Sequence, residues 1–139
     1  MKKVCILAII LSFLLLGCNR KYELPLHQET DQITKIELSE HTSGKRVVLC
    51  TLNSTEVLPF MEKLKAVSCY RYFNDPASDN AYLSVYLYYK NGEIDILGTG
   101  ICDTTSESNA PEGWYYLDVG ELWDLFSNYI PIENLPPRK

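Results

Sequence analysis

Apolar and polar residues alternate in several short stretches of this chain, and the alternation predicts most of its strands. Residues 33–40 (ITKIELSE) alternate in this way, and residues 46–52 (RVVLCTL) are apolar and rich in β-branched side chains, which predicts a buried strand. The intervening HTSGKR has turn composition, with Gly44 as the permissive residue. We therefore expect an antiparallel hairpin at the start of the folded domain.

A helix is predicted from Ser54 to about Ala66. Asn53 and Glu56 have the spacing of a capping box, in which each side chain bonds the backbone N–H of the other residue. The expected buried stripe of this helix consists of Leu58, Met61 and Leu64.

A second helix is predicted from Val119 to Tyr129. Asp118 and Glu121 repeat the capping pattern before it, and Pro131 stops it. Its expected buried stripe consists of Leu122, Leu125, Phe126 and Tyr129.

The strongest local signal is the segment AYLSVYLYYKNGEIDILGTG, residues 81–100. Asn91-Gly92 favours a two-residue type I′ turn, which would pair Lys90 with Glu93 and Tyr86 with Leu97. This pairing predicts a core face of Leu83, Val85, Leu87, Tyr89, Ile94 and Ile96, and an opposite face of Tyr82, Ser84, Tyr86, Tyr88, Asp95, Leu97 and Thr99.

A further strand is expected in WYYLDV, which begins at Trp114 after a long polar loop. The predicted fold is α+β, with an antiparallel sheet of about five strands, both helices packed on one of its faces, and the order ββαβββα. We expect a single domain over residues 31–130, followed by an extended C-terminal tail over residues 131–139.

The row of Tyr82, Tyr86 and Tyr88 with Leu97 is a candidate binding surface. If both helices cover one face of the sheet, these rings lie on the other face, and tyrosine is enriched at recognition surfaces. The alternative is cross-strand packing that only stabilises the hairpin, by several tenths of a kcal/mol per pair. The sequence leaves both interpretations open.

The first residues have the layout of an export signal. Lys2 and Lys3 precede an apolar run from Val4 to Leu16, which is shorter than the roughly 20 residues that a membrane-spanning helix needs. The run ends in Leu15-Leu16-Gly17-Cys18, which resembles the lipobox of bacterial lipoproteins.

This resemblance implies that residues 1–17 are a signal peptide, removed when Cys18 is lipidated and becomes the new N-terminus. Two acyl chains hold a protein firmly on a membrane without a spanning helix. The resemblance further implies an exported, lipid-anchored protein, on the outer membrane if the cell is Gram-negative. Residues 18–30 show no hydrophobic period, and we expect them to form a tether.

The charge of the mature chain argues against nucleic acid as a partner. Two of the 13 basic residues lie in residues 1–17. The mature chain therefore has 11 basic and 18 acidic residues, and its net side-chain charge is −7. Phosphate backbones require basic surfaces. Besides the membrane, the expected partner is an envelope protein or a glycan.

Beyond the leader and Cys18, the chain has three cysteines, so at most one disulfide can form within a monomer. We consider a bridge between Cys50 and Cys102, or three buried thiols, because the predicted helix separates Cys50 from Cys69. No spacing of cysteines and histidines indicates a metal site, and no motif indicates a cofactor.

No catalytic motif is present, and the chain has only two histidines, so we predict that the protein is not an enzyme. The leading hypothesis is a non-catalytic binding or interaction module. The alternative is an inhibitor or immunity-type protein that acts on an exported enzyme. An envelope hydrolase ranks last, and it would use the loop carboxylates Asp103, Glu107 and Glu112.

Overall fold

The computed structural model describes residues 21–72, 82–99 and 114–138, and within these ranges it has six strands and two α-helices. A four-stranded antiparallel sheet has the order β2-β1-β4-β5, and β3 pairs with β6 in a second antiparallel sheet. The predicted α+β class is confirmed, and β3 is one strand more than the sequence indicated. The elements are β1 (Ile33–Thr42), β2 (Lys45–Leu52), α2 (Ser54–Ala66), β3 (Cys69–Tyr72), β4 (Leu83–Tyr89), β5 (Ile94–Gly98), β6 (Trp114–Leu117), α3 (Val119–Phe126) and the short 3-10 helices η1 (Thr30–Gln32) and η2 (Ile132–Asn134).

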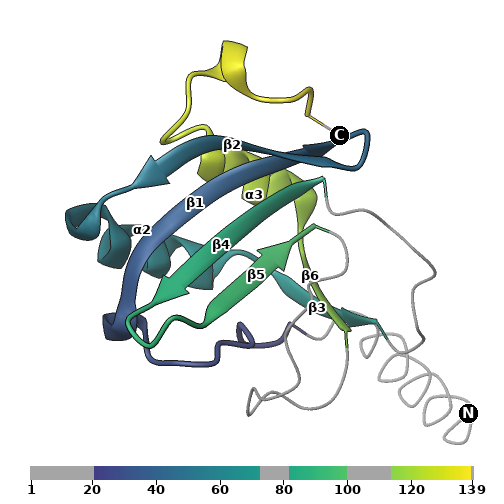
Figure 1. The fold of residues 1–139 in the computed structure, drawn as a ribbon. Coiled ribbons are helices and arrows are strands. Elements are labelled where there is room, and N and C mark those ends of the chain that lie inside the picture. The colour runs from purple at the N-terminus through teal and green to yellow at the C-terminus, as the bar shows by residue number, and fades with distance from the viewer. Residues whose placement is uncertain (1–20, 73–81, 100–113, 139) are drawn as a thin grey trace, which may run out of the picture.

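Both α-helices lie behind the four-stranded sheet in Figure 1, and the opposite face of the sheet is turned toward the viewer. The core fills the layer between helices and sheet, as the apolar pattern predicted. Its largest fully buried side chains are Tyr115, Phe60, Phe126, Ile36, Leu38, Leu52, Met61, Leu64, Leu83, Leu87, Leu97 and Leu117.

Helix α2 begins with the predicted capping box. Asn53 Oδ1 accepts from the backbone N–H of Thr55 at 3.0 Å, and Glu56 Oε2 accepts from the N–H of Asn53 at 3.0 Å. The predicted stripe was wrong at Leu58, which is 57% exposed. The helix is rotated so that its buried residues are Val57, Phe60, Met61 and Leu64, a spacing that keeps one continuous face toward the sheet.

Helix α3 ends at Phe126, three residues earlier than predicted, and buries Leu122, Leu125 and Phe126 as expected. Asp118 caps it, since its Oδ1 accepts from the N–H of Glu121 at 2.9 Å. The Glu121 carboxylate accepts hydrogen bonds from Ser68, which lies outside the helix. The backbone N–H and the hydroxyl of Ser68 donate to it at 2.6 and 2.9 Å. The carboxylate therefore joins α3 to the segment that follows α2.

The turn between β4 and β5 differs from the prediction by one residue. The N–H of Tyr89 donates to Glu93 O at 3.0 Å and that of Gly92 donates to Tyr89 O at 3.0 Å, so the loop has three residues and not two. Gly92 alone in this loop has a positive φ, of 90°, as in a G1 bulge. Because a shift of one residue turns a strand over, the predicted faces of β5 were wrong.

The observed pairing places Leu87 opposite Asp95 and Val85 opposite Leu97. Asp95 and Leu97 thus face the helices, and they are 0% and 1% exposed. Leu97 therefore does not belong to the tyrosine face where it was predicted. Ile94 and Ile96, expected in the core, lie opposite Tyr88 and Tyr86 on the other face of the sheet.

Both terminal segments pack on the domain, contrary to the expected tether and extended tail. The N–H of Tyr22 donates to Cys69 O at 2.9 Å, and Leu24 and Leu26 pack against the core. At the other end, Trp123 Nε1 on α3 donates to Pro136 O at 2.9 Å. The folded unit therefore includes residues 21–30 and the tail as far as the structure describes it.

Candidate functional site

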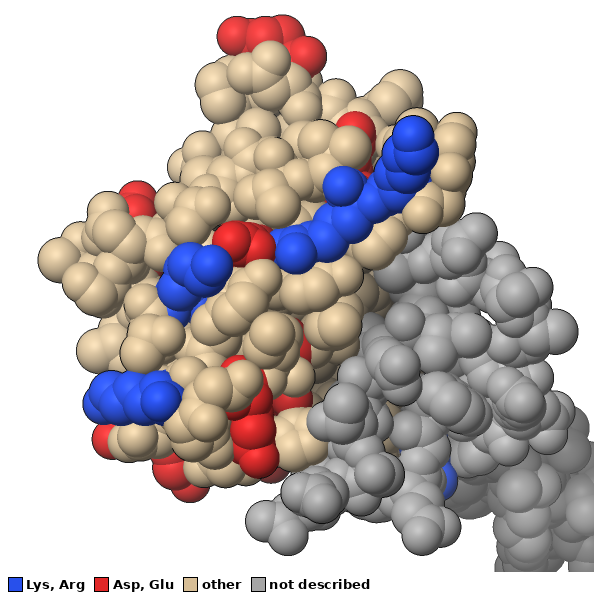
Figure 2. All heavy atoms as spheres, viewed as in Figure 1, with Lys and Arg blue, Asp and Glu red and all other residues tan. Residues whose placement is uncertain are grey.

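The face of the four-stranded sheet turned away from the helices, here called the outer face, is the principal candidate site. Basic side chains are spread across it with an acidic group between them (Figure 2), in a chain whose overall charge is negative. The strand register assigns to it Lys35, Glu37, Ser39, His41, Arg46, Val48, Thr51, Ser84, Tyr86, Tyr88, Ile94 and Ile96.

Glu37, on the central strand β1, organises the outer face. Its carboxylate accepts from Lys35 Nζ at 2.8 Å, from an Arg46 terminal amine at 2.5 Å, and from the Tyr88 hydroxyl at 2.6 Å. Partial burial by itself raises the pKa of Glu37, but these three hydrogen bonds outweigh burial and lower the pKa to about 2. Glu37 is therefore ionised at neutral pH.

The rings of Tyr86 and Tyr88 are each covered by a cation. The Arg46 guanidinium carbon lies 3.5 Å from the centroid of the Tyr86 ring, and Lys35 Nζ lies 4.0 Å from that of Tyr88. The sequence predicted rings open to a partner. The structure instead presents cations supported by rings, with Ile94 beside them at 40% exposure.

Tyr82, the first tyrosine of the predicted row, contacts a different region. Its hydroxyl donates to Pro137 O at 2.5 Å, and the side chain lines a hollow between the end of β1 and the C-terminal tail. Glu40 and Thr42 of β1 also line this hollow. Of the four residues predicted for the binding surface, the structure therefore brings together Tyr86 and Tyr88.

Two hydroxyl contacts lie beneath the cations of the outer face. His41 Nε2 is 2.9 Å from Ser84 Oγ, and Arg46 Nε donates to Ser39 Oγ at 3.0 Å. Partial burial and the nearby Arg46 lower the pKa of His41, so that its imidazole is neutral at pH 7. A serine next to a neutral histidine has the composition of a nucleophile and base, but Ser84 is 0% exposed. Ser84 is therefore inaccessible to a substrate, and its contact with His41 satisfies a buried hydroxyl group instead.

A second polar cluster surrounds Asp95 on the helix side of the sheet, and the sequence reasoning missed it. Asp95 accepts from the backbone N–H of His27 at 2.8 Å, from the Tyr89 hydroxyl at 2.6 Å, and from His27 Nδ1. Burial and the bond to Asp95 strongly raise the pKa of Tyr89. No sequence signal identified this cluster, because Asp95 faces the core only through the register that the three-residue turn sets.

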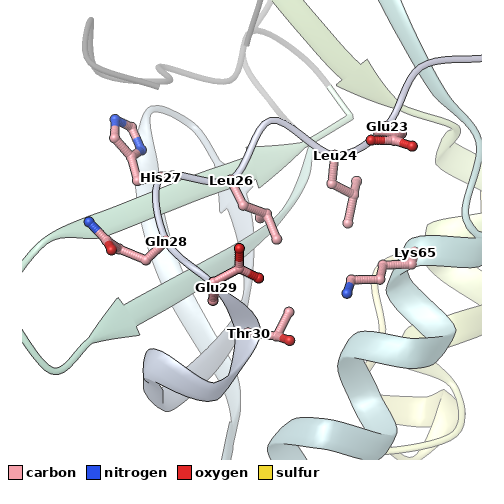
Figure 3. A pocket seen from close by; sticks show the side chains of 8 residues that line it. All are labelled: Glu23, Leu24, Leu26, His27, Gln28, Glu29, Thr30 and Lys65. Carbon is pink, nitrogen blue, oxygen red and sulfur yellow. The ribbon is translucent and has the colours of Figure 1, made fainter. Parts of the chain in front are cut away.

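A cavity of about 650 Å³ lies between residues 23–30 and Lys65 of α2. Leu24, Leu26 and Lys65 point toward this space in Figure 3, whereas His27 and Gln28 point away from it. The lining combines apolar groups with exposed charges of both signs. We therefore regard the cavity as the groove beneath the N-terminal segment, and not as a catalytic centre.

Several predicted residues lie outside the ranges that the structure describes, namely Cys18, Cys102, Asp103, Glu107 and Glu112. Cys50, which is half-buried, and Cys69, which is buried, are not bridged to each other, and burial raises the pKa of Cys69 to about 11. The bridge between Cys50 and Cys102 stays a prediction. Within the described ranges, His, Cys, Asp and Glu side chains form no group of three that could hold a metal ion.

Searches of protein-family models, of curated proteins and of solved structures found no significant match to this chain. Over residues 21–72, 82–99 and 114–138, no helix is long and apolar enough to cross a bilayer. The leader sequence and the geometry of the outer face are therefore the features of this chain that bear on its function.

Proposed function

We propose that this chain is an extracytoplasmic lipoprotein, anchored through Cys18, whose domain is a non-catalytic binding module. The lipobox Leu15-Leu16-Gly17-Cys18 supports the anchor. The outer face is the proposed binding surface. The observation that carries this proposal is the network around Glu37, which fixes two cations and two tyrosines on a sheet face that neither α-helix covers.

The composition of the outer face favours a protein partner with an acidic patch. Two cations, Arg46 and Lys35, surround one carboxylate, Glu37, so the centre of the outer face has a net positive charge. The chain as a whole has a net negative charge. Arginine and tyrosine are enriched among the residues that dominate binding energy. Glu37, Ser39 and the Tyr86 ring hold Arg46 in place before binding, which lowers the entropy lost on association. Because one side of each ring is occupied by a cation, stacking on a glycan is less favoured.

Site-specific cross-linking in native membranes tests the proposal. A photoreactive residue at Ile94 lies on the outer face, whereas the same residue at Leu58, also exposed, lies on α2 on the other side of the sheet. We expect one defined protein to be captured from Ile94 and not from Leu58. Arg46→Glu reverses the charge at the surface and should abolish that capture while the domain stays folded.

Equal capture from both positions, or capture from Ile94 that survives Arg46→Glu, would refute the outer face as the binding surface. If the captured protein is an exported enzyme that loses activity in the complex, the module acts as an inhibitor. Capture of a glycan in place of a protein would refute the proposed partner class.

A further inference from the structure

Residues 21–30, here called the strap, run along one edge of the domain before β1 (Figure 1). The start of the strap is docked on the two-stranded sheet. The N–H of Tyr22 donates to Cys69 O of β3 at 2.9 Å, and its ring meets Tyr115 of β6 edge-on with centroids 5.9 Å apart. The strap is therefore attached to the domain from Tyr22, which lies four residues after the proposed lipid site Cys18.

The other end of the strap is fastened to the four-stranded sheet. Asp95 of β5, which is 0% exposed, binds both the backbone N–H and the imidazole of His27, whose side chain is 5% exposed. Gln28 Nε2 also donates to Glu93 Oε2 at 3.0 Å. A buried carboxylate that loses such partners is strongly disfavoured, so these bonds hold the strap on the sheet.

The middle of the strap is packed as well. Pro25 is buried, and Leu24 and Leu26 contact the core while pointing toward the groove beside α2 (Figure 3). Since the strap is held at both ends and along its middle, it cannot serve as a flexible spacer.

The length of chain between lipid and domain follows from these contacts. Tyr22 lies four residues after Cys18, a distance of at most about 14 Å when fully extended. A free chain as far as Asp31 would reach about 45 Å. The polar headgroup region of one leaflet is itself roughly 5–8 Å thick.

On the basis of the proposed lipidation of Cys18, we infer that the strap holds the domain against the bilayer surface, and that the partner of the outer face is a protein of the same membrane. A module so close to its anchor meets proteins that are embedded in, or anchored to, that membrane.

The position of the domain is measurable by energy transfer. The lipidated full chain is reconstituted into phosphatidylethanolamine and phosphatidylglycerol vesicles that carry dansyl headgroups, and transfer from its tryptophans is recorded. A flexible insertion of ten Gly and Ser residues between Arg20 and Lys21 adds roughly 15–20 Å of root-mean-square reach, so we expect transfer to fall at least twofold. Equal transfer with and without the insertion would overturn the inference.

The fastening itself is tested by His27→Ala. This variant should raise the hydrogen-exchange rate of the Tyr22 amide at least tenfold and lower the energy transfer, while amides between β1 and β4 keep their protection. Unchanged exchange at Tyr22 would show that the imidazole contact with Asp95 does not hold the strap, and would count against the inference.

The partner class has a separate readout. The protein captured from Ile94 is located by fractionation in cells that lack this chain, and we expect it in the membrane fraction. A soluble partner would overturn the inference but leave the binding function standing. Mass spectrometry of the same preparation shows whether Cys18 carries lipid. A bare Cys18 thiol would mean that the protein has no lipid anchor, and would refute both proposals.

Discussion

Replacing Glu37 by glutamine removes the charge at the centre of the outer face and keeps the shape of the side chain. The pKa of Glu37 is lowered from 4.5 to about 2 in the folded protein. At about 1.4 kcal/mol per pKa unit, this shift sets an upper limit of about 3.5 kcal/mol on the stabilisation from ionised Glu37. Lys35 and Arg46 are 43% and 27% exposed, so solvent screening reduces the expected value to about 1–2 kcal/mol.

The sign of the pH dependence follows from the lowered pKa. The contribution of Glu37 is fully present above its unfolded pKa of 4.5 and is lost as the pH falls toward about 2. Urea unfolding of wild type and Glu37→Gln, followed by tryptophan fluorescence between pH 7 and pH 2, measures the difference in free energy of unfolding. We expect about 1–2 kcal/mol at pH 7 and a difference near zero at the lowest pH.

A matched control is Glu62→Gln, which changes an exposed carboxylate on α2. It should change the free energy of unfolding by less than about 0.5 kcal/mol at every pH. A Glu37→Gln difference that stays constant with pH would show that the hydrogen bonds to Glu37 do not favour its ionised form, and would refute the reasoning.

Three further predictions concern stability and thiol chemistry. Gly92→Ala should lower the free energy of unfolding by about 1 kcal/mol, because Gly92 has a φ of +90°. Gly120→Ala should not lower it, because Gly120 lies in a helix and has room for a Cβ. Urea unfolding of the two variants measures the difference. Phe60→Ala should cost about 3–5 kcal/mol in the same assay and Leu58→Ala less than about 0.5, and equal costs would contradict the observed rotation of α2. Cys69 should remain unmodified by iodoacetamide at pH 8 in the folded protein and react in urea, as mapped by mass spectrometry, because burial raises its pKa to about 11; rapid labelling before unfolding would contradict this.

Local signals in the sequence were reliable where a few neighbouring residues determine the structure. Asn53 and Glu56 predicted both the start of α2 and the two hydrogen bonds that cap it. The hairpin was also found, but its register depends on whether the Asn91-Gly92 pair forms a two-residue turn or closes a three-residue loop. Both turns accept the same dipeptide, so the sequence alone did not decide between them.

That single difference in the turn changed the candidate site. It moved Asp95 and Leu97 into the core and brought Ile94 and Ile96 to the outer face. It also hid the contact between His27 and Asp95, which are 68 residues apart in the chain. No pattern around His27 indicates such a partner, because long-range hydrogen bonds leave no periodic trace in a sequence.

The cation-covered tyrosines were likewise only half predictable. Alternation along β4 placed Tyr86 and Tyr88 on one face, as observed. The positions of Lys35 and Arg46 over their rings depend on the pairing of β1 with β4 and on the bulge between β1 and β2, which are tertiary features. Strand β3 was missed for a similar reason, since four residues gain their strand character only by pairing with β6.

Mass spectrometry of the mature N-terminal peptide, purified from native membranes, tests the central claim most directly. The account predicts a chain that begins at Cys18 and carries a diacylglyceryl group on its sulfur. A chain that begins at Met1, or a Cys18 with a bare thiol, would contradict the account.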